Sequence, residues 1–268
     1  KKMIIFIESN TSGSGISFLN YCKKLKIKYF FLTQNPKKYR LNKKVNYIKC
    51  DTNNINELIK ICKNLIKKNN IKAIFSTSDY YVISAYKLSN FFKLYKNNLN
   101  FLNICRNKIE LLKLLKKKGY IKRKFGKFEP RKKFNCQIII KPNSGTGSIN
   151  IRKYPKETIF NKDNINNLKG KDFYIYEEYI KGQEYSLELF FYKNNIVYKQ
   201  LIKKETNSKF VEIGHISSEK INNFKLILQN KLINYLKKLK LGTCFLHIEL
   251  KFINNNIEII EINPRLCG

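Results

Sequence analysis

The sequence lacks long apolar runs and close cysteine pairs. No hydrophobic stretch reaches the roughly 18 to 20 residues that span a membrane. The first apolar segment, MIIFIES, is too short and turns polar too soon for a signal peptide, so we expect a cytoplasmic protein with no membrane partner. The seven cysteines are odd in number and include no C-x-x-C pair. This pattern argues against a disulfide framework or a zinc site and predicts reduced, packed thiols.

Acidic residues and arginine are also scarce. The chain holds 19 Asp and Glu against 54 Lys and Arg, of which only six are Arg, and its formal net charge is +35. The lysines are spread over the whole length beside abundant Asn and Ile, residue types that share A/T-only codons. A coding bias that fills solvated faces explains this charge better than a specific nucleic-acid site. Non-specific binding to polyanions at low salt is expected in either case.

The first hundred residues alternate strand-like runs with amphipathic segments. The runs are MIIFIES, KYFFLT, VNYIKC and IKAIFST, and INELIKICKNLIKK has apolar residues at helical spacing. This alternation predicts a doubly wound α/β domain with a parallel sheet. The turn NTSGSG resembles a dinucleotide fingerprint without its third glycine, so nucleotide binding and a plain turn through Gly13 and Gly15 both stay open.

Strand-like patterns dominate after a helical segment at RNKIELLKLLKKKGY. Strands are expected at 137–141, 148–153, 173–179, 184–193, 196–204, 242–252 and 257–263, with a helix over about 219–239. Strands grouped after an alternating region indicate a second, α+β region. We therefore expect one domain over residues 1–97 and another over 98–268.

The C-terminal segment CFLHIELKFINNNIEIIEIN holds two alternating strands about an Asn-rich turn. A three-residue loop over 254–256 would place Glu249 opposite Glu261 and His247 opposite Asn263. Two opposed carboxylates repel each other, and a cation between them removes that cost. Carboxylates with an Asn carbonyl oxygen are ligands that Mg²⁺ uses beside nucleotide phosphates, whereas an exposed hairpin with tolerated acids is the alternative. The same register puts four residues on the core face: Ile248, Leu250, Ile260 and Ile262.

A glycine-containing loop follows an apolar strand in IIIKPNSGTGSINI, residues 138–151. Taken alone, it is either a hairpin that needs positive φ angles or a loop that folds over a phosphate with Lys141 as the counter-charge.

Three segments in this order, KPNSGTGSINI, YEEYIKGQEYSLE and HIELKF…IEIIEINPRLCG, resemble the ATP-grasp superfamily. Within it, the chain is similar to the carboxylate–amine ligases, such as L-amino acid ligases, D-alanine–D-alanine ligase and carbamoyl phosphate synthase. The resemblance covers about residues 100–268 and implies that 1–97 form the α/β domain that usually precedes the grasp. It implies a lid subdomain over 98–172 and a larger subdomain with the metal site over 173–268. The sequence stops where relatives continue, so we expect a two-lobed ATP-grasp domain that is truncated at its C-terminus.

The resemblance also implies a site for ATP with Mg²⁺ or Mn²⁺. Lys108 and Lys141 match the lysines that reach the ATP phosphates, and Glu184 matches the acid that holds the ribose hydroxyls. The implied phosphate lid consists of Ser144, Gly145, Thr146, Gly147 and Ser148, and the implied adenine hinge of Glu177, Glu178, Tyr179 and Ile180. The metal ligands are the residues reached from strand register: Glu249, Glu261 and Asn263.

The implied reaction is attack of a carboxylate on the γ-phosphate of ATP, followed by attack of an amine on the acyl phosphate, with release of ADP and phosphate. Lys141 would offset phosphate charge, and Arg265 would stabilise the acyl phosphate and the developing oxyanion or else form a C-terminal salt bridge. His215 aligns with a histidine often seen near the substrate or phosphates in amino acid ligases, or is structural. His247 is expected to orient Glu249, and Glu188 either supports the site or is exposed.

Three functions are compatible with these features. The leading one is an ATP-dependent ligase that joins a small-molecule carboxylate, an amino acid, to an amine. The second is an ATP-binding protein without ligase turnover, and the third is a polyanion-binding protein. Three explanations of the missing C-terminal segment stay open: the gene product continues beyond the given sequence, a separate chain supplies the segment, or this copy has decayed. A homodimer is the other assembly compatible with the sequence.

Overall fold

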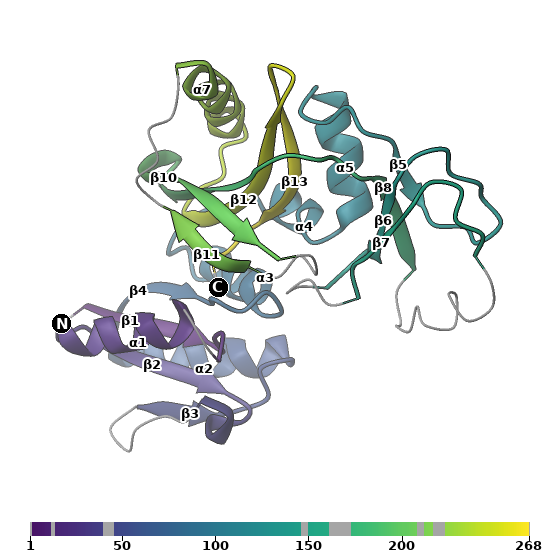
Figure 1. Ribbon diagram of the computed structural model, residues 1–268. Helices are drawn as coiled ribbons and strands as arrows, with labels where there is room; N and C mark the ends of the chain where they lie inside the picture. Colours follow the sequence, from purple (N-terminus) through teal and green to yellow (C-terminus); the bar gives the residue numbers. More distant parts are fainter. Residues whose placement is uncertain are drawn as a thin grey trace.

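The computed structural model describes residues 2–11, 14–39, 46–145, 150–160, 173–207, 212–216 and 223–267. Over these residues the chain forms one parallel sheet and two antiparallel sheets with helices packed on them (Figure 1). The parallel sheet is N-terminal, as the alternating pattern predicts, and the antiparallel sheets follow it in the chain.

The N-terminal sheet has the strand order β3-β2-β1-β4, with every neighbouring pair parallel. Its elements are β1 (Lys2–Ile7), α1 (Ser14–Lys24), β2 (Lys28–Thr33), the 3₁₀ helix η1 (Pro36–Tyr39), β3 (Tyr47–Lys49), α2 (Ile55–Lys68), β4 (Asn70–Phe75) and α3 (Val82–Phe91). Ile5 and Ile7 pack with α2 and α3, whereas Phe6 packs with α1 on the opposite face. Because side chains alternate along a strand, helices cover both faces, and the predicted doubly wound domain is confirmed.

The larger antiparallel sheet has the order β11-β10-β9-β12-β13. Its strands are β9 (Glu184–Tyr192), β10 (Asn195–Thr206), β11 (Glu212–Ile216), β12 (Cys244–Ile253) and β13 (Asn256–Asn263), and the helices packed with it are α4 (Leu99–Ile104), α5 (Lys108–Lys117) and α7 (Asn223–Lys238). Leu187, Ile248 and Ile259 form a core with Leu111 and Leu232 of the helices. The opposite face of the sheet carries polar side chains, such as Glu188 and His247, beside the stacked rings of Phe190 and Phe245.

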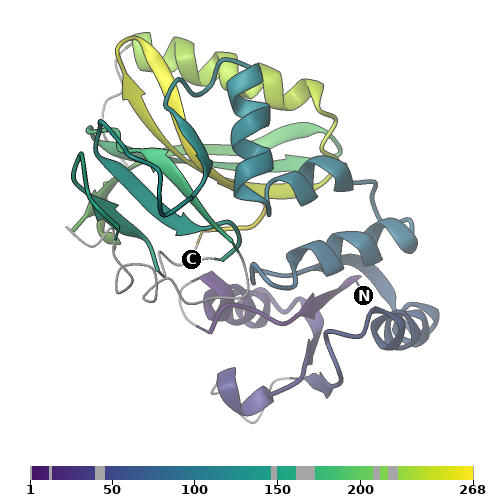
Figure 2. The same cartoon turned by 90° about the vertical axis from the view of Figure 1, so that its right-hand side faces the viewer.

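The smaller antiparallel sheet has the order β5-β8-β6-β7. Its strands are β5 (Phe125–Lys127), β6 (Ile138–Pro142), β7 (Arg152–Tyr154) and β8 (Tyr174–Glu178). Strand β8 lies beyond the expected boundary at residue 172, yet it pairs with both β5 and β6. The smaller sheet therefore contains residues on both sides of that boundary. Figure 2 shows it in teal beside α5, above the parallel sheet.

The register of the C-terminal hairpin confirms the predicted pairs and corrects the turn. Glu249 lies opposite Glu261 and His247 opposite Asn263. The three-residue loop is wrong, because Ile253 pairs with Asn256 and leaves a two-residue turn. Both turn residues, Asn254 and Asn255, have positive φ angles of 42° and 62°, which asparagine tolerates and which tight hairpin turns require.

A bulge restores the register between this turn and the site. Glu249 pairs with Glu261, but the next residue, Leu250, pairs with Ile259, so Ile260 is the extra residue on β13. Ile259 is fully buried in the core, and Ile260 is partly exposed. The prediction that Ile260 lies on the core face is therefore wrong, because the bulge places Ile259 in the core instead.

Five of the seven cysteines are buried, as packed thiols would be: Cys22, Cys50, Cys62, Cys105 and Cys244. Burial raises the pKa of the Cys62 thiol to about 12, so this thiol stays protonated at neutral pH. None of the helices that the structure describes is long and apolar enough to cross a membrane.

Candidate nucleotide and metal site

The polar face of the larger sheet gathers acids and cations on neighbouring strands. Lys204 of β10 donates from Nζ to Oε1 of Glu249 at 2.8 Å. Lys108, at the start of α5, approaches Oε1 of Glu261 from the other side at 3.2 Å. Each of the two opposed carboxylates therefore contacts a lysine, and their mutual repulsion is offset from both sides.

His247 lies between two carboxylates on the same face. Its Nδ1 is 2.5 Å from Oε1 of Glu188, and its Nε2 is 3.2 Å from Oε1 of Glu249. Burial alone would lower the pKa of His247, but hydrogen bonds to the two carboxylates outweigh it and raise the pKa to about 9. The imidazolium therefore donates to both acids at neutral pH, and its contact with Glu249 agrees with the expected orienting role. Glu188 is buried rather than exposed, because it holds the other side of this ring.

Lys204 and His247 also set the charge of Glu249. Burial would raise the pKa of this carboxyl, but the hydrogen bond from His247 and the charge of Lys204 outweigh burial and hold the pKa well below its usual range. Glu249 is therefore a carboxylate at any pH near neutrality, which is the form that ligates metals.

The oxygen atoms of the two opposed glutamates and of Asn263 are of the kind that a hard divalent cation takes as part of its ligand set. Asn263 is buried and pairs with His247 across the ladder, so the two glutamates and this amide occupy adjacent positions of one hairpin. Among the described residues, no group of three or more His, Cys, Asp or Glu side chains is arranged to hold a metal. A cation here would therefore take further oxygens from water or phosphate, as Mg²⁺ does.

Lys108 connects this hairpin to the glycine-containing loop. Its Nζ donates to the Gly145 carbonyl at 2.9 Å, and its backbone N–H donates to the Asn143 carbonyl at 3.2 Å. The side chain of Asn143 also accepts a hydrogen bond from the backbone N–H of Ile109. Gly145 has a φ of 123°, which favours glycine. The loop thus begins against the first turn of α5; Ser144 and Gly145 are described, whereas Thr146, Gly147 and Ser148 lie outside the described residues.

Lys141 takes part in a buried ion-pair cluster. Its Nζ lies 2.5 Å from Oε1 of Glu177, whose Oε2 is 2.6 Å from Nη2 of Arg123. Arg123 also pairs with Glu258 of β13 at 3.1 Å, so the cluster joins the two antiparallel sheets. Burial would raise the pKa of Glu177, but Lys141 and Arg123 outweigh it and lower the pKa to about 2. The Glu177 side chain is therefore committed to these cations, and only its backbone is left for a nucleotide base.

Two of the expected hinge residues, Tyr179 and Ile180, and the expected ribose acid Glu184 lie close to lysines. Lys251 donates from Nζ to the Ile180 carbonyl at 3.0 Å, and Lys153 lies over the Tyr179 ring. Glu184 opposes Lys251 across β9 and β12. Burial and the nearby charge of Glu249 raise the pKa of Glu184, although Lys204 lies 3.4 Å away. The expected ribose acid thus shares Lys204 with the expected metal ligand Glu249.

Glu178 is half-buried and His215 is exposed. Glu178, the last residue of β8, accepts a hydrogen bond from the backbone N–H of Lys124 at 3.2 Å. His215 lies on β11, opposite Lys204, so its side chain points to the same side of the sheet, but it is exposed.

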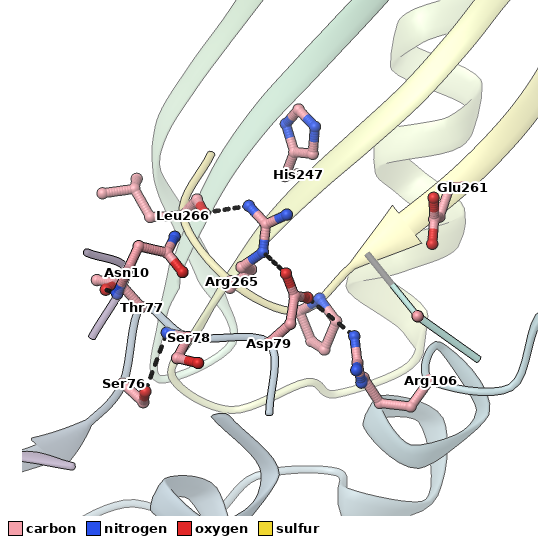
Figure 3. A network of polar contacts seen from close by, with 12 residues as sticks. Asn10, Ser76, Thr77, Ser78, Asp79, Arg106, His247, Glu261, Arg265 and Leu266 are labelled. Carbon is pink, nitrogen blue, oxygen red and sulfur yellow. Dashed lines mark hydrogen bonds and ion pairs between the residues drawn. The ribbon is translucent and has the colours of Figure 1, made fainter. Parts of the chain in front are cut away.

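Arg265 follows Asn263 and reaches the end of the parallel sheet. Its Nε donates to Oδ2 of Asp79, in the turn after β4, and Nη1 of Arg106 donates to the other oxygen of Asp79 at 2.9 Å (Figure 3). Nη1 of Arg265 also donates to the Leu266 carbonyl at 2.8 Å. The salt bridge of Arg265 is therefore made with the N-terminal part of the chain.

Sequence reasoning missed several of these residues. Lys204 reaches the site through the pairing of β10 with β9, and Arg123 through ion pairs made from the segment before β5. One lysine among so many carries no local signal. Asp79 had a usable signal, because it comes soon after the carboxyl end of β4, where parallel sheets place ligand-binding residues.

Comparison with known proteins identifies the family of the chain and structures with a similar fold. Residues 134–268, half of the chain, match the ATP-grasp domain family. No curated protein matches the sequence significantly. Among solved structures, the fold is similar to an L-amino acid ligase from Bacillus licheniformis, with a TM-score of 0.78 at 14% identity, over 100% of this chain and 68% of that one.

Two further structures share the fold. Phosphoribosylglycinamide synthetase from Anaerococcus prevotii has a TM-score of 0.67 at 18% identity, over 99% of this chain and 68% of that chain. N5-carboxyaminoimidazole synthetase from Staphylococcus aureus, complexed with ADP, has a TM-score of 0.71 at 16% identity, over 99% and 70%. A family match over half of the chain, on the hairpin and loop that carry the polar site, places this chain in the ATP-grasp family.

Proposed function

We propose that this chain is an ATP-dependent carboxylate–amine ligase that forms an amide bond through an acyl phosphate and releases ADP and phosphate. One observation carries the proposal. Glu249 and Glu261 are opposed on a partly buried hairpin face, and Lys108 contacts both Glu261 and the glycine-containing loop. A polyphosphate bound between that loop and the two acids would contact lysine side chains on the loop side. On the other side, a metal ion would link it to the two carboxylates.

The proposed chemistry depends mainly on position and charge. A divalent cation, when held by Glu249, Glu261 and Asn263, supplies neutralisation of phosphate charge. Lys108 donates to phosphate oxygens from the loop side, and Lys141 does so from β6, where Glu177 and Arg123 fix its ammonium.

The remaining proposed roles follow from position. Glu184, at the start of β9, holds the ribose hydroxyls, and the backbone of 177–180 holds the base. Arg265, just beyond the expected ligand Asn263, stabilises the acyl phosphate. His247 stays charged and orients Glu249, which keeps the first metal ligand ionised.

We propose an amino acid as the carboxylate substrate. The similarity to an L-amino acid ligase supports this choice only through the fold, because the identity is 14%. We also propose that residues 1–97 form the N-terminal domain and that the grasp follows it, with β8 assigned to the lid lobe because of its pairing.

A direct assay tests the proposal. The purified protein is incubated with Mg²⁺-ATP and pairs of amino acids, and ADP and phosphate are measured for each pair. The expected result is ADP release that depends on both substrates and is lost in Glu261→Gln. Nucleotide binding without substrate-dependent ADP release would contradict ligase turnover and leave a nucleotide-binding protein. Salt-sensitive binding to polyanions with no nucleotide binding would contradict the proposed function altogether.

A further inference from the structure

The carboxyl ends of β1 and β4 form a polar junction directly under the segment that follows β13. The strand order reverses at β1, which lies between β2 and β4, and open α/β sheets bind ligands at such a point. Oγ of Ser9 and Oγ1 of Thr77 are 2.7 Å apart, and the backbone N–H of Asn10 donates to the same Thr77 oxygen. The two strand ends are thus tied together where Asp79 begins the next turn.

Asp79 joins three parts of the chain that are distant in sequence. It lies in the turn after β4, Arg106 lies just before α5, and Arg265 lies just after β13. Its side chain is only 6% exposed, and each carboxylate oxygen accepts from a different guanidinium. Figure 3 shows Asp79 between the two arginines, with Glu261 and His247 above them on the larger sheet.

The backbone around Arg265 is held as well. The hydroxyl of Tyr86, on α3, donates to the Pro264 carbonyl at 3.0 Å and accepts from the backbone N–H of Phe245 at 3.3 Å. Burial raises the pKa of Tyr86 well above its ordinary value, so the hydroxyl keeps its proton. The main chain at Pro264 is therefore fixed from α3, and the direction of the Arg265 side chain is set separately by Asp79.

The charges in this cluster do not cancel. Two guanidinium groups share one carboxylate, and a guanidinium has five N–H donors, of which Arg265 uses those at Nε and Nη1 in the contacts above. Without the carboxylate, the two like charges would repel each other and Arg265 would turn away from Arg106. Asp79 thus holds the Nε side of the Arg265 guanidinium beside the segment that follows Glu261 and Asn263, while the Leu266 carbonyl holds Nη1.

We propose that Asp79 is the positioning residue for Arg265: it holds the guanidinium where it binds the phosphoryl group transferred from ATP, and Arg106 fixes the second Asp79 oxygen. This inference rests on the proposed function, since it assigns Arg265 to that group. Asp79 itself touches no substrate. Its effect on the reaction passes through the direction of one side chain.

Inorganic phosphate, added to the protein with Mg²⁺-ADP, is the probe. The variants are Asp79→Asn, Arg265→Gln and the double variant, and affinities for Mg²⁺-ADP and for phosphate are measured separately by calorimetry. Asp79→Asn should weaken phosphate binding by about tenfold or more, as expected for a lost contact to a charged group, and change Mg²⁺-ADP affinity by less than about twofold. The double variant should bind phosphate no worse than Arg265→Gln alone, because both changes remove one interaction.

A matched control and a milder variant complete the design. Glu110→Gln breaks an exposed pair with Lys113 of 2.8 Å by the same acid-to-amide change and should leave both affinities unchanged. Should Asp79→Asn not fold, Arg106→Gln replaces it, with a smaller loss of phosphate affinity that again disappears in the Arg265→Gln background.

The outcomes separate the two proposals. Loss of phosphate binding in Arg265→Gln but not in Asp79→Asn overturns the role of Asp79 and leaves the proposed function intact. Additive losses in the double variant overturn it too, because they show a general structural effect. Unchanged phosphate binding in both single variants overturns the assignment of Arg265, and a parent protein that binds no Mg²⁺-ADP overturns the proposed function together with this inference.

Discussion

Glu177→Gln removes the charge at the centre of the cluster that holds Lys141. The carboxylate has a pKa of about 2, against 4.5 for an ordinary glutamate, because Lys141 and Arg123 outweigh the burial that would raise it. A shift of this size corresponds to about 3 kcal/mol of stability. In other proteins, removal of one partner of a buried ion pair lowers the free energy of unfolding by about 3–5 kcal/mol. We therefore expect the free energy of unfolding at pH 7 to fall by about 3 kcal/mol.

The sign of the pH dependence follows from the lowered pKa. The stabilisation from Glu177 is fully present above pH 4.5 and is lost as the pH falls towards about 2. The difference in the free energy of unfolding between the parent and Glu177→Gln should therefore become smaller as the pH is lowered below 4.5. Urea unfolding at pH 7, 5 and 3.5 measures this difference.

The neighbouring residue provides the control. Glu178→Gln makes the same substitution at a site whose carboxylate accepts from the Lys124 backbone at the surface. It should cost less than about 1 kcal/mol. The reasoning fails if Glu177→Gln costs no more than Glu178→Gln, or if its cost is the same at pH 3.5 as at pH 7.

Three further variants test the nucleotide site. Lys141→Ala should weaken Mg²⁺-ATP binding by about 10- to 100-fold, measured by calorimetry, whereas the exposed Lys113→Ala should not, and equal affinities would contradict the role of Lys141. Glu184→Gln should weaken ATP binding more than binding of inorganic tripolyphosphate, and equal losses would contradict the ribose role. Glu261→Gln should leave the melting temperature of the ligand-free protein nearly unchanged, because the relief of repulsion from Glu249 offsets the loss of the ion pair with Lys108. The same variant should lose the rise in melting temperature that Mg²⁺-ATP gives the parent. A full rise in the variant would exclude a metal shared by the two glutamates.

The parts of the fold that were predictable depend on local pattern. The strands of the parallel sheet are short apolar runs, and α2 has apolar residues at helical spacing with Asn54 as its N-cap. Helices α3 and α4 and strands β5 and β11 were not expected. Strand β11 is an exposed edge whose neighbours in the chain supply no pattern, and it is defined by its pairing with β10.

The parts of the site that were not predictable depend on contacts between distant segments. Arg123, Glu177 and Glu258 lie on three separate segments, and each looks like an ordinary surface charge in the sequence. Their burial comes from the packing of the smaller sheet against β13, which no local periodicity encodes. Lys108 differs, because the family resemblance identified it although its pairing with Glu261 was unknown.

The hairpin shows how a correct pairing can follow from an incorrect turn. A two-residue turn alone would shift the pairing by one residue, which moves every side chain of one strand to the other face relative to its partner. The extra residue Ile260 cancels that shift before Glu261, so the two glutamates stay opposed. The bulge is visible in the sequence, because IEIIEIN departs from strict alternation of apolar and polar residues at Ile259 and Ile260. One of these isoleucines lies in the core and the other does not. Because bulges often re-aim side chains beside active sites, this break in alternation supports a functional role for Glu261 as well as explaining its register.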